Sequence, residues 1–125
     1  VGALIVIKRE MPLASYEYTG DIINADVNSR LIENIFFKNS PMHDGAMIIS
    51  DNRIRAAGCI LPVSHSLDIP KSLGLRHRAA LGISQETDAI AVVVSEETGN
   101  ISVAMNGKFK LRLSTKELEQ ILATA

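Results

Sequence analysis

Apolar positions along the chain fall into short runs, and their spacing distinguishes two kinds of element. Runs with little polar interruption, rich in valine and isoleucine, are typical of strands buried in a sheet. Turn-forming residues separate these runs from one another. The predicted strands are Leu4–Ile7, Ala46–Ser50, Ile54–Val63, Ala89–Val94, Asn100–Ala104 and Lys108–Leu113.

Two pairs of these strands are separated by very short polar segments. Asp51-Asn52 precedes the strand at Ile54, and Asn106-Gly107 precedes the strand at Lys108. Asn, Asp and Gly tolerate the positive φ angles that two-residue hairpin turns require. Each pair is therefore predicted to form an antiparallel hairpin.

Helical spacing appears where the strand pattern stops. Leu31, Ile32, Ile35 and Phe36 share one face of a helix. The predicted helices are Ser29–Lys38 with Asn28 as its N-cap, about Arg76–Ser84, and a C-terminal helix opened by a capping box of Ser114 and Glu117. Two polar, proline-containing stretches are predicted loops: Met11–Gly20 and Ser64–Ser72.

Strands interleaved with helices indicate an α/β fold, with a central mixed β-sheet flanked by helices. The 125 residues fit a single domain covering 1–125. With 46% hydrophobic and 22% charged residues, the chain can form a hydrophobic core without disulfide bonds or structural metal ions. No apolar run approaches the about 20 residues that a membrane-spanning helix needs.

Charge and side-chain content narrow the function. Thirteen Lys and Arg against 14 Asp and Glu leave a net charge of -1, which excludes duplex nucleic acid binding by bulk charge. No tryptophan and 4% aromatic residues leave little material for stacking on single strands. Cys59 is the one cysteine, so it forms no internal disulfide and no zinc site alone. We expect it to be a buried small hydrophobic residue.

The first of three polar clusters is Pro41–Ala46, directly before a predicted strand. Asp44 is a hard oxygen ligand suited to Mg²⁺ or Mn²⁺, and it can also accept a proton from an attacking hydroxyl. Gly45 has no side chain, so a ligand can approach its backbone closely. The same residues are also compatible with a plain Asp-Gly turn that enters the strand.

The second cluster is Leu73–Ala80, at the start of a predicted helix. Three cations and no acid lie between Lys71 and Arg78. Helix N-termini and arginines both bind phosphate. Because residues two apart point to different sides of a helix, Arg76 and Arg78 need not share a ligand. One can bind phosphate while the other holds the loop or reaches another subunit. A solvated basic helix start is the alternative.

The third cluster is Ser95–Gly99, directly after a predicted buried strand. Adjacent carboxylates can ligate a cation or hold arginines in place, and Ser95 can donate to a phosphate oxygen. An exposed charged turn is the alternative. Together, the three clusters are the parts that metal-assisted phosphoryl or nucleotidyl transfer requires. No Walker-type glycine loop and no nucleophile elbow occur in the chain.

The segments Ser40–Ala46, Gly74–Arg78 and Ser95–Gly99, in this order and spacing, resemble the diadenylate cyclase domain over essentially the whole chain. The chain is most similar to the catalytic domain of the membrane-anchored class. The resemblance implies a fragment that lacks an N-terminal transmembrane region. It also implies a location at the cytoplasmic face of the membrane and a membrane-bound regulator acting through the missing region.

The resemblance further implies that two ATP molecules condense to cyclic di-AMP and two pyrophosphates, with Mn²⁺ or Mg²⁺. The twofold symmetry of that product predicts a homodimer in which each subunit holds one ATP. The implied catalytic residues are Asp44, Arg76, His77 and Arg78. The implied ATP-binding residues are Met42, Gly45, Ala46, Ile60, Leu61, Gly74, Leu75, Arg76, His77, Arg78, Ser95 and Glu96. The implied metal ligands are Asp44, His43 and Glu97.

Two positions depart from the family pattern. Leu75 stands where many relatives have threonine, which removes a hydroxyl contact to the phosphates, and Ile60 stands where some have an aromatic residue. Three alternative functions stay open. They are a non-catalytic adenine-nucleotide sensor, another nucleotidyltransferase and a structural interaction domain.

Overall fold

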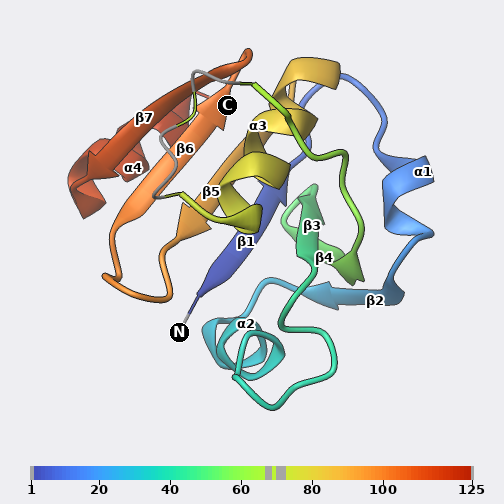
Figure 1. Cartoon of the computed structure of the whole chain (residues 1–125). Coiled ribbons are helices and arrows are strands. Elements are labelled where there is room, and N and C mark those ends of the chain that lie inside the picture. Colours follow the sequence, from blue (N-terminus) through green and yellow to red (C-terminus); the bar gives the residue numbers. More distant parts are fainter. Residues whose placement is uncertain (1, 67–68, 70–72, 125) are drawn as a thin grey trace.

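One mixed sheet of seven strands, in the order β2-β4-β3-β1-β5-β6-β7, organises the molecule (Figure 1). The computed structural model describes residues 2–66, 69 and 73–124. The strands are β1 (Ala3–Ile7), β2 (Asp21–Asp26), β3 (Ala46–Ser50), β4 (Arg53–Cys59), β5 (Ile90–Val94), β6 (Ile101–Met105) and β7 (Lys108–Leu113). The helices are α1 (Ala14–Glu17), α2 (Ser29–Ile35), α3 (Leu75–Glu86) and α4 (Thr115–Ala123).

Strand β1 lies at the centre of the sheet. It pairs in parallel with β3, through Ile5 opposite Met47, and antiparallel with β5, through Ile5 opposite Val92. The remaining pairs, β2 with β4, β3 with β4, β5 with β6 and β6 with β7, are antiparallel. The sheet is therefore mixed, as the sequence predicted.

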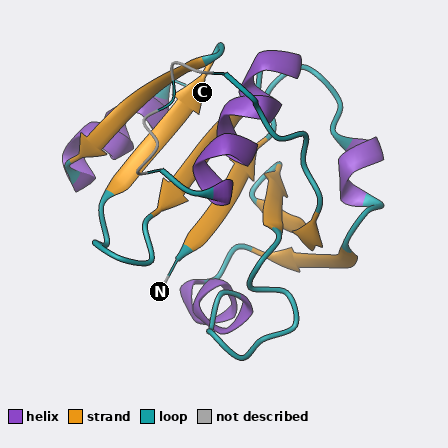
Figure 2. Ribbon diagram, in the orientation of Figure 1, coloured by secondary structure: helices purple, strands orange, loops and turns teal. Residues whose placement is uncertain are grey.

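Helices cover both faces of the sheet (Figure 2). Because successive side chains of a strand point to opposite faces, Leu4 and Val6 of β1 pack with residues of α1 and α3. Ala3 packs on the other face with residues of α2. Ile90 and Val92 pack on that same face against α4. This confirms the predicted α/β architecture.

The predicted caps and turns are confirmed. The Asn28 side chain accepts from the backbone N–H groups of Arg30 and Leu31, and Ser114 and Glu117 form a capping box. Both turn pairs have positive φ, as two-residue hairpins require. Cys59 is 2% exposed, which confirms it as a buried hydrophobic residue.

The strand predicted to run to Val63 was wrong in its second half, since β4 ends at Cys59. The Thr19 hydroxyl accepts from the Ile60 N–H at 2.7 Å, which takes that donor away from the ladder. Ile60 itself is 70% exposed.

Two further elements differ from the prediction. β2 was missed, and α1 forms one turn inside the predicted loop Met11–Gly20. The helix predicted over Ser29–Lys38 ends earlier, at Ile35. Of the predicted loop Ser64–Ser72, residues 67–68 and 70–72 lie outside the described residues, and so does the cation Lys71.

Candidate active site

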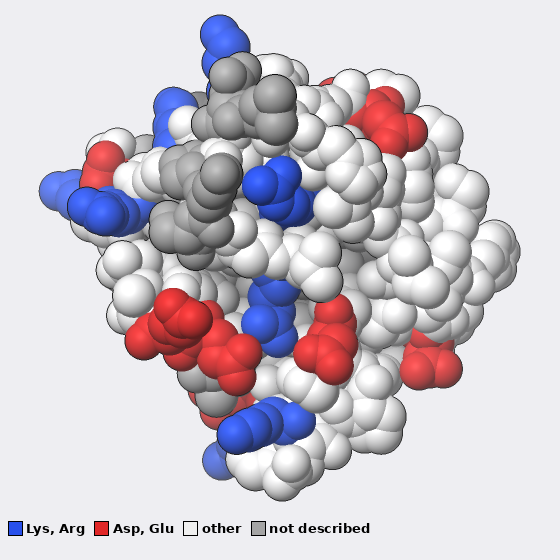
Figure 3. All heavy atoms as spheres, in the orientation of Figure 1, with Lys and Arg blue, Asp and Glu red and all other residues white. Residues whose placement is uncertain are grey.

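A cavity of about 1200 Å³ opens beside the start of α3. Its walls come from the loop before β3, the residues after β4, the start of α3, the segment joining β5 to β6, and the end of β7. Figure 3 shows basic atoms in the hollow of this face, with acidic atoms on both sides of it. All three polar clusters that the sequence singled out contribute residues to this one cavity.

The wall before β3 carries Asp44, whose side chain is 84% exposed. The backbone turns here, with the His43 N–H donating to the Ser40 carbonyl at 3.2 Å. The His43 ring packs beside the carboxylate, with Nε2 2.9 Å from Asp44 Oδ1 and Nδ1 2.8 Å from the Ser40 oxygen. Asp44 therefore presents a carboxylate to the cavity, and His43 holds one of its oxygens from behind.

Gly45 lines the cavity, and the structure gives a packing reason for a glycine at this position. A Cβ on Gly45 would lie 2.8 Å from the carbonyl oxygen of Gly58, and closer still to the Cα and carbonyl carbon of Gly58. Gly58 has φ of +67°, which is itself a conformation that favours glycine. Two glycines thus let the β3 and β4 backbones meet next to Asp44.

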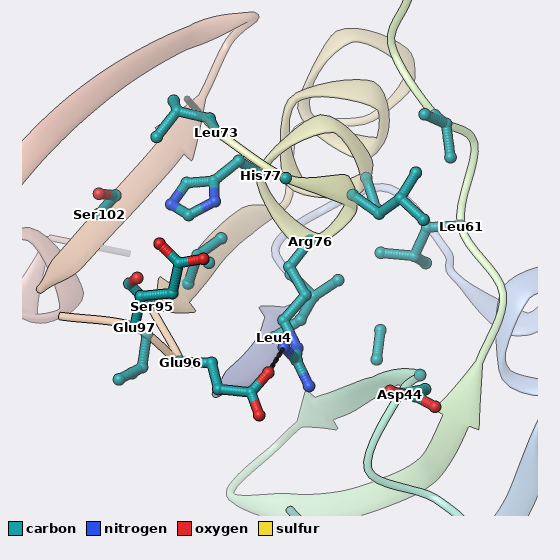
Figure 4. A pocket seen from close by; sticks show the side chains of 18 of the residues that line it. Leu4, Asp44, Leu61, Leu73, Arg76, His77, Ser95, Glu96, Glu97 and Ser102 are labelled. Carbon is teal, nitrogen blue, oxygen red and sulfur yellow. Dashed lines mark hydrogen bonds and ion pairs between the residues drawn. The ribbon is translucent and has the colours of Figure 1, made fainter. Parts of the chain in front are cut away.

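Arg76, in the first turn of α3, lies between the two acidic walls (Figure 4). Its Nη1 is 3.4 Å from Glu96 Oε2, and its Nη2 donates to the His43 carbonyl at 3.2 Å. Its Nε is buried and has no hydrogen-bond partner. The guanidinium therefore links the Asp44 loop to the turn after β5.

Arg78 takes a different direction from Arg76, as expected for helix residues two apart. Its Nη1 donates to the carbonyl oxygens of Ser64 and Ser66, at 3.3 and 3.4 Å. Arg78 is not among the described residues that line the cavity. Arg78 thus holds the loop that follows β4, one of the two roles the sequence left open.

His77 lines the cavity and is 8% exposed. Its ring lies 6.1 Å from the ring of Phe109, in a tilted arrangement. Burial, and then the positive charge of Arg76, lower the pKa of His77 from 6.5. The ring is therefore held neutral near pH 7 and can act as a hydrogen-bond donor or acceptor.

The opposite wall is the turn between β5 and β6. The Ser95 N–H donates to the Asn100 carbonyl and the Gly99 N–H donates to the Ser95 carbonyl, both at 2.9 Å. Figure 4 shows Ser95, Glu96 and Glu97 on this side and Asp44 on the other. Two of the three predicted metal ligands, Asp44 and Glu97, therefore line this cavity, on opposite walls. The third, His43, does not line it.

Among the described residues, no group of three or more His, Cys, Asp or Glu could hold a metal ion. A single exposed carboxylate fits Mn²⁺ or Mg²⁺ when substrate phosphates supply further ligands, which is the usual arrangement for Mg²⁺ with nucleotides. Asp44 meets that requirement by position and exposure.

The other predicted nucleotide contacts divide by position. Six of them line the cavity: Ala46, Ile60, Leu61, Gly74, Leu75 and Glu96. Met42 packs instead beside the second core on the α2 face, against Gly58. Leu73 and Thr98 also line the cavity, and they belong to two of the clusters but were given no contact. Four further lining residues were missed because they belong to no motif: Asn100, Ser102, Leu111 and Arg112.

Comparisons with known proteins show which family the chain resembles. Residues 1–109 match the family model described as DisA bacterial checkpoint controller nucleotide-binding (DAC). Cyclic di-AMP synthase CdaA of Bacillus subtilis (strain 168) is 49% identical over 122 residues, covering 98% of this chain and 45% of that protein. A diadenylate cyclase of Listeria monocytogenes (strain 10403S) has the same identity and coverage. The chain spans about half the length of the curated relatives it matches.

Solved structures share the fold. A double mutant of DacA from Staphylococcus aureus superposes with a TM-score of 0.97 and 48% identity, over 99% of this chain and 83% of that one. A protein from Bacillus cereus described as a hypothetical membrane spanning protein gives 0.86 and 43%, over 90% and 55%. Within the described part of this chain, no helix has the length and apolar character to cross a membrane.

Proposed function

The chain belongs to the DAC family, and from this premise we propose that it is a diadenylate cyclase, which condenses two ATP molecules to cyclic di-AMP and two pyrophosphates. The observation that carries the proposal is the convergence of the three polar clusters on one cavity. Its volume of about 1200 Å³ is ample for a nucleoside triphosphate, since ligand pockets commonly measure about 300–1,000 Å³.

The start of α3 is suited to the triphosphate. Gly74 at the N-cap offers no side-chain cap, so the N–H groups of the first helical turn are left without that partner. Gly74, Leu75, Arg76 and His77 all line the cavity. Unpaired N–H groups and the helix dipole both favour an anion at this point.

Asp44 is the residue we assign to the attacking hydroxyl. In each half-reaction the ribose 3′-oxygen of one ATP bonds to the α-phosphorus of the other, the bond from that phosphorus to pyrophosphate breaks, and the 3′-hydroxyl loses its proton. Asp44 orients the hydroxyl and accepts that proton. A Mn²⁺ or Mg²⁺ ion held by Asp44 and the phosphates would neutralise charge and polarise the hydroxyl.

Turnover requires a homodimer in this proposal. The product has twofold symmetry, and a pair of facing sites places each 3′-hydroxyl opposite the other α-phosphate. The rim of the cavity supports this reading, because Ile60 and Leu75 line it and are 70% and 74% exposed. A second subunit would cover both. Specific activity that stays constant on dilution, while sedimentation shows monomers, would overturn the dimer requirement.

The test of the activity is incubation with ATP and Mn²⁺ or Mg²⁺, followed by chromatography for cyclic di-AMP. Asp44→Asn should abolish the product and leave the melting temperature unchanged, because the carboxylate is exposed. Asp51→Asn is the matched control, since Asp51 is 81% exposed at the far end of β3 and outside the cavity. Product from Asp44→Asn, or none from the unmodified chain, would contradict the proposal.

We also infer that the chain acts in a longer protein at the cytoplasmic face of the membrane, where a membrane-bound regulator reaches it. The membrane location is supported by the description of the Bacillus cereus structure as a hypothetical membrane spanning protein, whereas the cytoplasmic side and the regulator are carried over from the family resemblance. Recovery of the full-length protein in the soluble fraction of lysed cells would contradict this.

A further inference from the structure

We propose that Arg112, on β7, binds the phosphate tail of the nucleotide; this rests on the proposed function, which supplies the nucleotide. Arg112 lines the cavity together with its neighbour Leu111. The match to the family model ends at residue 109, three residues before Arg112. Three observations on β7 carry the proposal.

The first observation is a change of face along β7. Phe109 packs with the core on the α3 face, whereas Leu113 packs with the core on the α4 face. In a regular strand, residues four apart lie on the same face. The in-and-out alternation of side chains is therefore broken once between Phe109 and Leu113, near Leu111 and Arg112.

The second observation is the bulge that causes this change. Val103 pairs with Lys110 and Ile101 pairs with Leu113, so two steps along β6 correspond to three along β7. Arg112 has φ of +55°, in the left-handed region that an arginine seldom adopts. Bulges next to active sites often redirect a side chain. Here the bulge puts two consecutive residues, Leu111 and Arg112, on the cavity wall.

The third observation is the state of the cations around the cavity. Arg76 is held by Glu96 and the His43 carbonyl, and Arg78 by two loop carbonyls. The guanidinium of Arg112 has no ion pair or hydrogen bond with any other residue that the structure describes. Of the two described arginines that line the cavity, Arg76 has both Nη atoms engaged within the protein, whereas the guanidinium of Arg112 is open to an incoming anion.

These observations assign the two kinds of arginine different tasks. Arg76 and Arg78 organise the walls, while Arg112 offers five N–H donors and a permanent charge to phosphate oxygens. Its position on the β7 wall, across the cavity from the Asp44 loop, suits the end of the nucleotide away from the reacting ribose. A strained backbone at Arg112 persists because surrounding pairing holds it, as is common at ligand sites.

The test measures binding with 3′-deoxy-ATP, which lacks the attacking hydroxyl and so cannot be cyclised. Arg112→Gln should weaken its binding about tenfold by calorimetry, as expected for loss of a charge-assisted hydrogen bond. Binding of 3′-deoxyadenosine, which has no phosphate, should be unchanged. Lys110→Gln is the matched control, because Lys110 has the same charge on the same strand and does not line the cavity.

A second variant separates charge from backbone strain. Arg112→Gly relieves the positive φ, so it should melt no lower than the unmodified chain and still bind 3′-deoxy-ATP as weakly as Arg112→Gln. Arg112→Gln binding within twofold of the unmodified chain would overturn the proposal. Equal weakening by Lys110→Gln, or an equal loss of 3′-deoxyadenosine binding, would overturn it as well. The assay measures binding and not product formation. Its result can therefore be interpreted even if the chain proves to have no cyclase activity.

Discussion

Gly45→Ala should destabilise the fold, because the new methyl group would meet a main chain that has little room to move. The built Cβ lies 2.8 Å from the Gly58 carbonyl oxygen and closer to two backbone carbons. Separations under 3.0 Å force one strand to shift. Overpacking of this kind typically costs about 1–3 kcal/mol, and we expect the upper half of that range because the obstacle is backbone.

The size of the melting shift follows from the chain length. The entropy of unfolding is about 2.1 cal/mol/K per residue, so for this chain of 125 residues it is about 0.26 kcal/mol/K near the midpoint. A loss of about 2–3 kcal/mol therefore lowers the melting temperature by about 8–12 °C. Circular dichroism at 222 nm, recorded about every degree, resolves a shift of this size.

Gly74→Ala is the matched control for that measurement. Gly74 also lines the cavity, yet a Cβ built there meets nothing within 4 Å and its φ is -89°. Its melting temperature should stay within about 3 °C of the unmodified chain, since the entropy gained and the weaker N-cap nearly cancel. If Gly45→Ala melts within that same margin, close packing is not the reason for a glycine before β3.

Two further predictions concern titration and reactivity. The pKa of His77 is lowered by burial and by Arg76, so the unfolded chain binds a proton below about pH 6.5 that the folded chain resists; stability should fall as the pH drops from 7.5 to 5.5. His77→Gln should flatten that dependence, His65→Gln at an exposed position should not, and parallel melting curves for all three proteins would contradict the assignment. Burial, and then the charge of Glu17, raise the pKa of the Cys59 thiol to about 11, so about one thiol in a thousand is ionised at pH 8. A disulfide reagent should modify Cys59 far more slowly in the folded chain than in urea, and equal rates would show that the thiol is not protected.

The elements that the sequence predicted well are those specified by neighbouring residues. Asn28 caps α2 through contacts two and three residues away, and Ser114 and Glu117 cap each other. The turn at Asn106-Gly107 is likewise local. Such signals act within one turn of chain, so they are legible without the fold.

β2 was missed because its pattern is that of an edge strand. Asp21, Asn24 and Asp26 are exposed, and only Ile23 and Ala25 are half-buried. Its pairing with β4 is interrupted at Asn24, whose φ is +54°. Strand propensity depends on the neighbours that pack against a strand, which a single segment does not reveal.

The candidate site divides in the same way. Asp44, Arg76 and Glu96 belong to short motifs, which the sequence could relate to one another by resemblance, and all three line the same cavity. The division of labour between Arg76 and Arg78 needed the helix, and the approach of Gly45 to Gly58 needed the paired strands. Arg112 reaches the cavity only through a bulge, for which the sequence carries no local sign.

The central position of β1 has a consequence for how the chain folds. The strands on one side, β2, β4 and β3, and the meander β5-β6-β7 on the other join only through β1 in the sheet order. During synthesis β1 emerges before its partners β3 and β5, which follow roughly 40 and 90 residues later, so its pairing must close long loops. We therefore expect each side to nucleate as hairpins, and β1 to join them late, in the step that makes unfolding cooperative. Because one core cluster joins Ile48 and Ala56 on one side to Ala91 and Ala104 on the other, a substitution that weakens β1, such as Val6→Ala, should destabilise both sides together in one melting transition.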